Sequence, residues 1–168
     1  MNRQVVALVA AATLLAGCAQ NPVGIPTWGP WQVPLVSLEA LSAAPDTVTV
    51  DAQSYRLEAH AWRNFQPIVP DSGPPMYAVA KLIEADSLAI AQDVELAYLW
   101  MVRGEDSAGV PFLDPAQPGW PPWMQVKRAA HLPQWGPHIF VDIVVAVRDP
   151  SGGLTLVAAR DVWIERAD

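Results

Sequence analysis

The feature that most constrains this chain is a strongly alternating face of branched apolar residues over residues 139–147. Five branched apolar residues occupy every second position there: Ile139, Val141, Ile143, Val145 and Val147. Side chains two residues apart point to the same face of a β-strand, so this period places all five on one buried face. The sequence Asp-Pro-Ser-Gly-Gly at residues 149–153 is typical of a turn. We therefore expect a β-hairpin with strands over residues 139–148 and 154–165.

Similar short segments recur along the rest of the chain, and no long helical period accompanies them. They cover residues 47–51, 55–62, 76–85, 94–103 and 124–130. Within residues 94–103, alternation predicts one shared face for Val94, Leu96, Tyr98, Trp100 and Val102. About seven short strands with turn signals between them indicate an all-β domain. We predict a single antiparallel β-sandwich of immunoglobulin-like architecture, with a small β-barrel as the alternative.

The N-terminal segment has the pattern of an export signal. Arg3 precedes an uncharged apolar run over residues 5–15, which is too short to span a membrane as a helix. The run ends in Leu15-Ala16-Gly17-Cys18, which resembles the lipobox of bacterial lipoproteins cleaved by signal peptidase II. The resemblance implies that residues 1–17 are removed and that Cys18 receives fatty acyl chains. Several acyl chains anchor a protein stably, so a membrane is the first expected partner.

The same resemblance implies a location. Residue 19 is alanine rather than aspartate, and in a Gram-negative host the sorting rule of these lipoproteins then implies the outer membrane, facing the periplasm. The resemblance covers only the N-terminal segment. Beyond it, residues 57–65 followed by a proline-rich turn look like strands of uncharacterised bacterial lipoproteins, which adds no function.

The chain between this cysteine and the first predicted strand is rich in proline. Prolines at positions 22, 26, 30 and 34 disfavour helices and central strands. We predict that residues 18–45 form the lipidated cysteine and a tether, with at most one helical turn at residues 37–41. Residues 46–168 then form the sandwich domain.

Composition narrows the possible partners. The formal net charge is −7 and no basic stripe is present, which argues against nucleic acid as a partner. The hydrophobic fraction of 52% is too high for a disordered chain. Because Cys18 is the only cysteine, the sequence excludes a disulfide framework and a multi-cysteine metal site. No cofactor is expected.

Tryptophan is the most distinctive residue type, with eight in the chain. The proline pair in Trp120-Pro-Pro-Trp123 favours polyproline II geometry, which projects both indoles the same way. Together with Trp135, they are predicted either to line a site for cell-wall glycan or peptide, or to cover one end of the sandwich as a plug. Three other tryptophans are expected to be packing residues within strands: Trp62, Trp100 and Trp163.

Two histidines suggest a weak metal site. His131 and His138 flank a six-residue loop and are predicted to approach each other across it, while His60 lies on a different strand. Copper is the periplasmic metal that such a site suggests. The methionines are scattered rather than clustered, however, and no thiolate is available. Surface histidines and core methionines explain the same residues equally simply.

The sequence offers few groups for catalysis. Glu58 and His60 share one strand face at a spacing of two and form a possible acid–base pair, but a solvated polar face also explains them. The acidic pair Glu105-Asp106 is predicted to end a strand, with residues 107–109 as a solvated turn. Phosphate loops, dinucleotide fingerprints, nucleophile elbows and zinc-protease motifs are missing from the sequence. We therefore expect no enzyme activity.

These features rank four functional hypotheses. The first is a lipid-anchored envelope protein that binds a macromolecular partner, or supports an envelope assembly, without catalysis. A module that binds cell-wall glycan or peptide through the tryptophans is the first alternative. Periplasmic metal handling is the second alternative, and an enzyme that uses Glu58 and His60 is the last.

Overall fold

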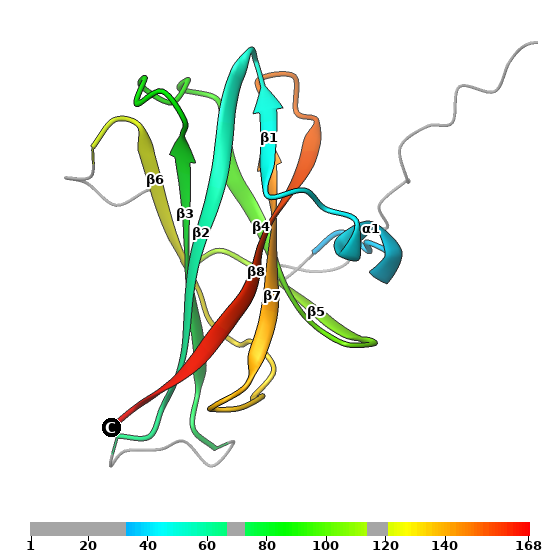
Figure 1. The fold of residues 1–168 in the computed structure, drawn as a ribbon, viewed down its shortest axis with the longest axis vertical. Helices are drawn as coiled ribbons and strands as arrows, with labels where there is room; N and C mark the ends of the chain where they lie inside the picture. Colours follow the sequence, from blue (N-terminus) through cyan, green and yellow to red (C-terminus); the bar gives the residue numbers. More distant parts are fainter. Residues whose placement is uncertain (1–32, 67–72, 114–120) are drawn as a thin grey trace, which may run out of the picture.

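The computed structural model describes residues 33–66, 73–113 and 121–168, which form one curled sheet with a short helix beside it (Figure 1). The elements follow one another as α1 (Leu38–Ser42), β1 (Thr47–Val50), β2 (Gln53–Asn64), β3 (Met76–Glu84), β4 (Glu95–Arg103), β5 (Asp106–Pro111), β6 (Met124–Ala129), β7 (Phe140–Arg148) and β8 (Leu154–Ala167). The strand order is β5-β4-β7-β8-β2-β3-β6, and β1 pairs with β2 outside this path. The all-β class is therefore confirmed.

The sheet is mixed rather than antiparallel throughout. Strand β8 pairs antiparallel with β7 over most of its length, and its last four residues pair parallel with β2, from Ala61↔Ile164 to Asn64↔Ala167. In Figure 1 this long red strand runs from beside β7 to beside β2, so it joins both halves of the sheet. The expected immunoglobulin-like sandwich of antiparallel strands is not confirmed, because the strands form a half-barrel instead.

The concave side of the half-barrel holds the main core. Every second residue of β7 contributes to it, as the alternation predicts, through Val141, Ile143, Val145 and Val147. Other members of this core come from β2, β3, β4 and β8, among them Tyr55, Leu57, Ala61, Met76, Leu82, Leu99, Met101, Val157 and Ile164. Burial of this apolar surface is the main stabilising contribution to the fold.

Side chains bridge the two margins of the half-barrel between β6 and β4. The Gln125 side-chain oxygen accepts from the backbone N–H of Leu96 at 2.6 Å, and its amide nitrogen donates to the Val94 carbonyl at 3.3 Å. The buried ammonium of Lys127 donates to the Leu96 carbonyl at 2.8 Å and lies 3.4 Å from Glu95. These bonds satisfy backbone groups of β4 beyond the end of β5, where the strand ladder does not reach.

A β-bulge divides β4 between two faces. Its pairing with β7 shifts between Leu96 and Tyr98, and an extra residue in one strand reverses which face later residues occupy. Val94 and Leu96 therefore lie in the main core, whereas Trp100 and Val102 lie on the convex side. The single shared face predicted for these residues was wrong because alternation alone does not reveal a bulge.

The region after β4 also differs from the prediction. The turn consists of Gly104 and Glu105, with Gly104 at a φ of 58°, and Asp106–Pro111 is strand β5 rather than a solvated turn. Glycine adopts this left-handed conformation without the steric penalty of a side chain, which suits a two-residue hairpin. The acidic pair therefore marks the start of a strand.

A second core lies on the convex side, where α1 covers β4, β7 and β8. It contains Leu41 and Ala44 from the N-terminal segment and Trp100 from β4. The single helical turn predicted at residues 37–41 is confirmed at Leu38–Ser42, with the Ser37 hydroxyl accepting from the Ala40 N–H at 3.2 Å. Leu41 and Ala44, which lie in the expected tether, therefore pack against the sheet.

Candidate functional site

Exposed aromatic rings lie on the convex face where α1 does not reach. Phe140 on β7 and Trp163 on β8 are register partners, and their ring centroids are 4.8 Å apart. Phe140 is 60% exposed and Trp163 is 40% exposed, and the His138 ring lies 5.7 Å from that of Trp163. Contiguous exposed apolar residues, rather than single ones, are the surface feature associated with interaction sites.

A second aromatic cluster lies on the same face beside the end of β8. The ring of Trp62 stacks on His60 at 5.2 Å and on Tyr77 at 5.6 Å, on β2 and β3 respectively. Glu165 is the register partner of Trp62, and its carboxylate lies 3.7 Å from the His60 Nε2. A hollow of about 480 Å³ opens over this cluster, lined by His60, Trp62, Val79, Lys81, Glu165 and Ala167.

A polar hollow of about 280 Å³ lies on the other side of Phe140. Its lining includes Arg103, Asp142 and Asp161. The Asp142 carboxylate accepts from the Arg160 guanidinium at 2.8 Å and from the Asp161 backbone N–H at 3.1 Å. These contacts fix the carboxylate at the point where the β7–β8 register shifts.

The two hollows and the rings between them form one surface along β8. Asp161, Trp163 and Glu165 alternate along the strand, so their side chains share its convex face. Asp161 lines one hollow, Glu165 lines the other, and Trp163 with Phe140 lies between them. We call this surface, made by these four residues together with His60 and Trp62, the β8 track.

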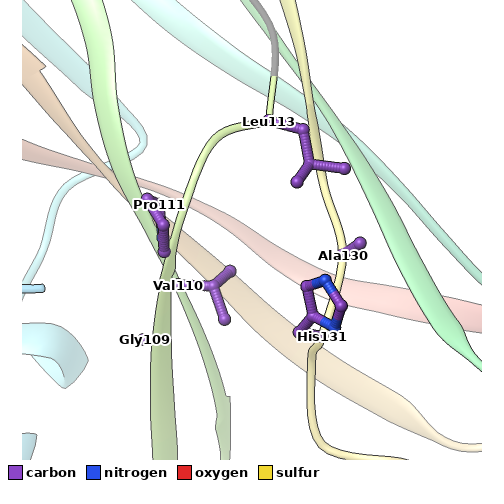
Figure 2. A pocket seen from close by; sticks show the side chains of 6 residues that line it. All are labelled: Gly109, Val110, Pro111, Leu113, Ala130 and His131. Carbon is purple, nitrogen blue, oxygen red and sulfur yellow. The ribbon is translucent and has the colours of Figure 1, made fainter. Parts of the chain in front are cut away.

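A separate apolar cavity lies where the two edge strands diverge. The Leu113 N–H donates to the Arg128 carbonyl at 2.8 Å, and beyond this bond a cavity of about 420 Å³ opens. Figure 2 shows Val110 of β5 and His131, which follows β6, on opposite sides of it. Its lining comprises Gly109, Val110, Pro111, Leu113, Ala130 and His131. No carboxylate, ammonium or guanidinium is among these lining residues, so the cavity suits an apolar group.

Of the three predicted site tryptophans, the structure describes Trp123 and Trp135, and it places them apart. Trp123 precedes β6, where its carbonyl accepts from the Glu84 N–H at 2.9 Å. Trp135 follows β6 and packs partly buried against the main core. A six-residue strand is roughly 20 Å long, so the two indoles belong to opposite ends of β6. Trp120 lies outside the described residues.

The two candidate metal ligands have different surroundings. His131 lines the apolar cavity, whereas the His138 ring lies against Trp163 beside the β8 track. Both have a positive φ, of 60° and 68°, at the two ends of the loop that joins β6 to β7. Within the described residues, no group of three or more His, Cys, Asp or Glu side chains is arranged to hold a metal ion.

The candidate acid–base pair is divided between different partners. Glu58 forms an ion pair with Arg56, while His60 pairs with Glu165 and stacks on Trp62. Glu58 and His60 do lie on one convex strand face, as the alternation predicts. The contacts around them therefore join Glu58 and His60 to different neighbours rather than to each other.

Two groups with shifted pKa values lie away from the track. Burial raises the pKa of the Tyr55 hydroxyl, which donates to the Gln53 side-chain oxygen at 2.6 Å. Hydrogen bonds, first from the Ser151 hydroxyl and then from the Gly153 backbone, lower the pKa of Asp149 in the β7–β8 turn. Both shifts reflect structural roles, since neither residue lines one of the three hollows described above.

The sequence contained part of the signal for the β8 track. Trp62 follows Arg56, Glu58 and His60 on the polar side of an alternating strand, and Phe140 is out of phase with the apolar face of β7. The sequence predicts that Trp62, Trp100 and Trp163 are packing residues within strands. Of these three, only Trp100 is buried. The pairing of β2 with β8, which places their rings on one surface, joins residues about a hundred positions apart and has no local signal.

Comparison with known proteins adds no family. No protein-family model matches this chain, and neither does any curated protein or solved structure. Cys18 lies outside the described residues. Across the described residues, no helix is both long and apolar enough to cross a membrane.

Proposed function

We propose that this chain is a lipid-anchored bacterial envelope protein that binds a macromolecular partner, or supports an envelope assembly, without catalysis. The lipobox-like sequence ending in Cys18 supports the anchor and, with Ala19, supports an outer-membrane location facing the periplasm. The acidic net charge supports a partner other than nucleic acid.

The observation that carries the binding role is the exposed aromatic pair on the β8 track. Phe140 and Trp163 contact each other on a convex sheet face and together leave a continuous apolar surface in water. The charged neighbours of this pair are held by fixed contacts: Glu165 faces His60, and Asp142 accepts from Arg160. A rigid aromatic centre with oriented polar groups at its edge is the arrangement of a binding surface.

The anchor is tested by the single substitution Cys18→Ser. Wild-type protein expressed in bacteria should sediment with membranes and resist a high-salt wash, whereas C18S should leave the membrane fraction. Leu15→Ile, which changes the lipobox sequence while keeping the cysteine and an apolar side chain, is the matched control. Unchanged fractionation of C18S would contradict the anchor.

The binding role is tested in the C18S background, where the acyl chains no longer hold the protein. The full chain is mixed with washed, sedimented envelope material, and the bound fraction is measured. We expect retention of C18S and its loss when Phe140→Ala and Trp163→Ala are added. Leu154→Ala is the matched control, because Leu154 is a 37% exposed apolar residue at the other end of β8. If the protein with Phe140→Ala and Trp163→Ala is retained as well as the protein with Leu154→Ala, the binding role of the track is overturned.

The alternative sites receive less support from the structure. Trp123 and Trp135 lie at opposite ends of β6, so they do not line one glycan or peptide site. His131 and His138 have different neighbours, and no third ligand accompanies them among the described residues. The β8 track therefore replaces the proline-rich tryptophan segment as the site that the proposal uses.

A further inference from the structure

Resting on the proposed function, the geometry points to a neutral glycan chain as the partner that the β8 track binds. This names the ligand class of the same surface and assigns its residues to separate roles. The exposed rings of Phe140 and Trp163 take the apolar faces of sugar rings, while the hollows on both sides take their hydroxyl and amide groups.

The first argument is the alternation of ring and charge along the track. Sugar rings present C–H groups on their faces and hydroxyl groups at their edges, so they need an aromatic surface with hydrogen-bonding groups beside it. The track has this order, from Asp161 through Trp163 to Glu165. Both hollows contain donors as well as acceptors, with Arg103 in one and Lys81 in the other.

The second argument concerns the backbone, and it disfavours an extended peptide. Peptides that bind by strand addition hydrogen-bond to the free edge of a sheet. Strand β8 lies between β7 and β2 in the sheet order, and it pairs with β7 up to Trp163 and with β2 over its last four residues. Its N–H and C=O groups lie in the plane of the sheet, so the convex face of β8 offers side chains to a ligand.

The third argument concerns charge. The carboxylates of Asp142, Asp161 and Glu165 surround the aromatic pair, and the formal net charge of the chain is −7. Like charges repel, so this surface disfavours an acidic polysaccharide. A neutral glycan does not meet this repulsion.

The fourth argument is length. Four residue steps separate Asp161 from Glu165, which corresponds to roughly 13 Å along the strand before either hollow is added. A single sugar ring would contact the aromatic pair and leave both hollows empty. The dimensions therefore fit a chain of several sugars that runs along β8.

The test is calorimetric titration of the full-length protein with neutral and acidic oligosaccharides. The probes are the hexamers of N-acetylglucosamine and of β-1,4-linked glucose, with a galacturonic acid hexamer as the acidic comparison. We expect saturable binding of at least one neutral hexamer and a much weaker response to the acidic one. Trp163→Ala should weaken neutral binding about tenfold or more, as for a central aromatic contact, and Leu154→Ala should not.

A second variant keeps the test independent of folding. Glu165→Gln retains every ring and the shape of the hollow and removes one charge, so we expect it to fold normally. Because the amide still donates and accepts hydrogen bonds, we expect it to weaken the binding of neutral hexamers by less than Trp163→Ala does. Relative to wild type, it should bind the acidic hexamer better, because one repelling carboxylate is gone. Circular dichroism melting of each variant shows whether lost binding reflects lost structure.

The outcomes separate this inference from the proposed function. If neither neutral hexamer binds, while envelope retention still depends on Phe140 and Trp163, the partner is a protein and the glycan inference is overturned. If the acidic hexamer binds best, the charge argument is wrong and the inference fails as well. If retention does not depend on these rings, the proposed role of the track fails independently of the titrations.

Discussion

Trp100 and Trp163 occupy the same convex side of the sheet and have opposite surroundings. Trp100 on β4 is 4% exposed and belongs to the second core, whereas Trp163 on β8 is 40% exposed. Both lie in strands, and both have apolar neighbours in the sequence. The difference shows that burial on the convex face depends on what covers each half of the sheet rather than on the strand itself.

The cover over Trp100 comes from residues 33–44. Leu41 of this segment is fully buried in the second core with Trp100. The guanidinium of Arg160 holds the end of α1 by donating to the carbonyls of Ser42 at 2.9 Å and Ala44 at 2.6 Å. Figure 1 shows α1 beside β4 and β7, away from β3 and β6. The half of the face that carries Trp163 has no such cover among the described residues, so its rings remain available.

Glycine at position 109 makes close packing over the covered half possible. A Cβ atom there would lie 2.6 Å from the Trp100 Nε1 and 2.7 Å from the Val33 Cγ1. Both distances are shorter than any ordinary contact, so a side chain would displace the indole or the N-terminal segment. The covered half therefore depends on one small residue in β5.

The largest expected effect is that of Trp100→Ala. Removing a buried indole loses its transfer free energy and leaves a cavity beneath α1, so we expect the free energy of unfolding to fall by about 3–5 kcal/mol. Urea denaturation followed by circular dichroism measures this change. A loss below about 1 kcal/mol would mean that the second core contributes little to stability, and it would remove the contrast between the two halves.

Arg160→Ala should have the next largest effect, because it releases the cover without altering the core. Arg160 also pairs with Asp142 at 2.8 Å, and both side chains are about one-third exposed, so solvent screening reduces the contribution of the pair. We expect a loss of about 1–2 kcal/mol, with faster amide exchange in α1 than in β7. Arg148→Ala is the matched control, since Arg148 pairs with the side chain of Glu95 and is not bonded to the α1 segment.

The sequence predicted the elements well where the pattern was local. Alternation identified the inward face of β7, turn residues identified the β7–β8 hairpin, and Ser37 marked the start of the single helical turn. It failed at β4, where the bulge after Leu96 moves Trp100 to the convex side, and at β5, whose hairpin turn is only two residues long. Both failures come from backbone detail that residue type alone does not specify.

The site was less predictable than the fold because it depends on distant pairing. Trp62 and Glu165 become neighbours because β2 pairs parallel with β8. The two residues are about a hundred positions apart, and no local sequence pattern indicates which distant strands pair. Similarly, nothing in the sequence near Trp163 distinguishes an uncovered strand face from one that α1 covers. The sequence pattern instead favours a site at the tryptophans in proline-rich segments, yet Trp123 and Trp135 lie at opposite ends of β6.

Trp163→Ala sharpens the comparison in the opposite sense to Trp100→Ala. Because Trp163 is substantially exposed and contacts Phe140 and His138 at the surface, we expect a stability loss of about 1 kcal/mol or less. Envelope retention in the C18S background should nevertheless be lost. Should the melting temperature fall as far as in Trp100→Ala, Trp163 would be a structural residue and the β8 track would lose its central ring.

The smallest expected effect on stability is that of a substitution at Asp149, in the turn that joins β7 to β8. The Asp149 carboxylate accepts from the Ser151 hydroxyl at 2.6 Å and from the Gly153 N–H at 2.8 Å, and these bonds lower its pKa in the folded state. A carboxyl whose pKa is lower when folded stabilises the protein above its unfolded pKa, near 4, and loses that contribution as the pH falls through the folded value.

We therefore expect Asp149→Asn to melt slightly below wild type at pH 7, with the difference shrinking as the pH falls below about 4. Differential scanning calorimetry of both proteins from pH 7 to pH 2.5 measures this, and a difference independent of pH would contradict a role for the ionised carboxylate. The turn adjoins the covered half, where Ala146 and Leu156 pack in the second core. Binding by the β8 track should therefore be the same in both proteins at pH 7, since the turn and the exposed rings occupy opposite ends of one hairpin.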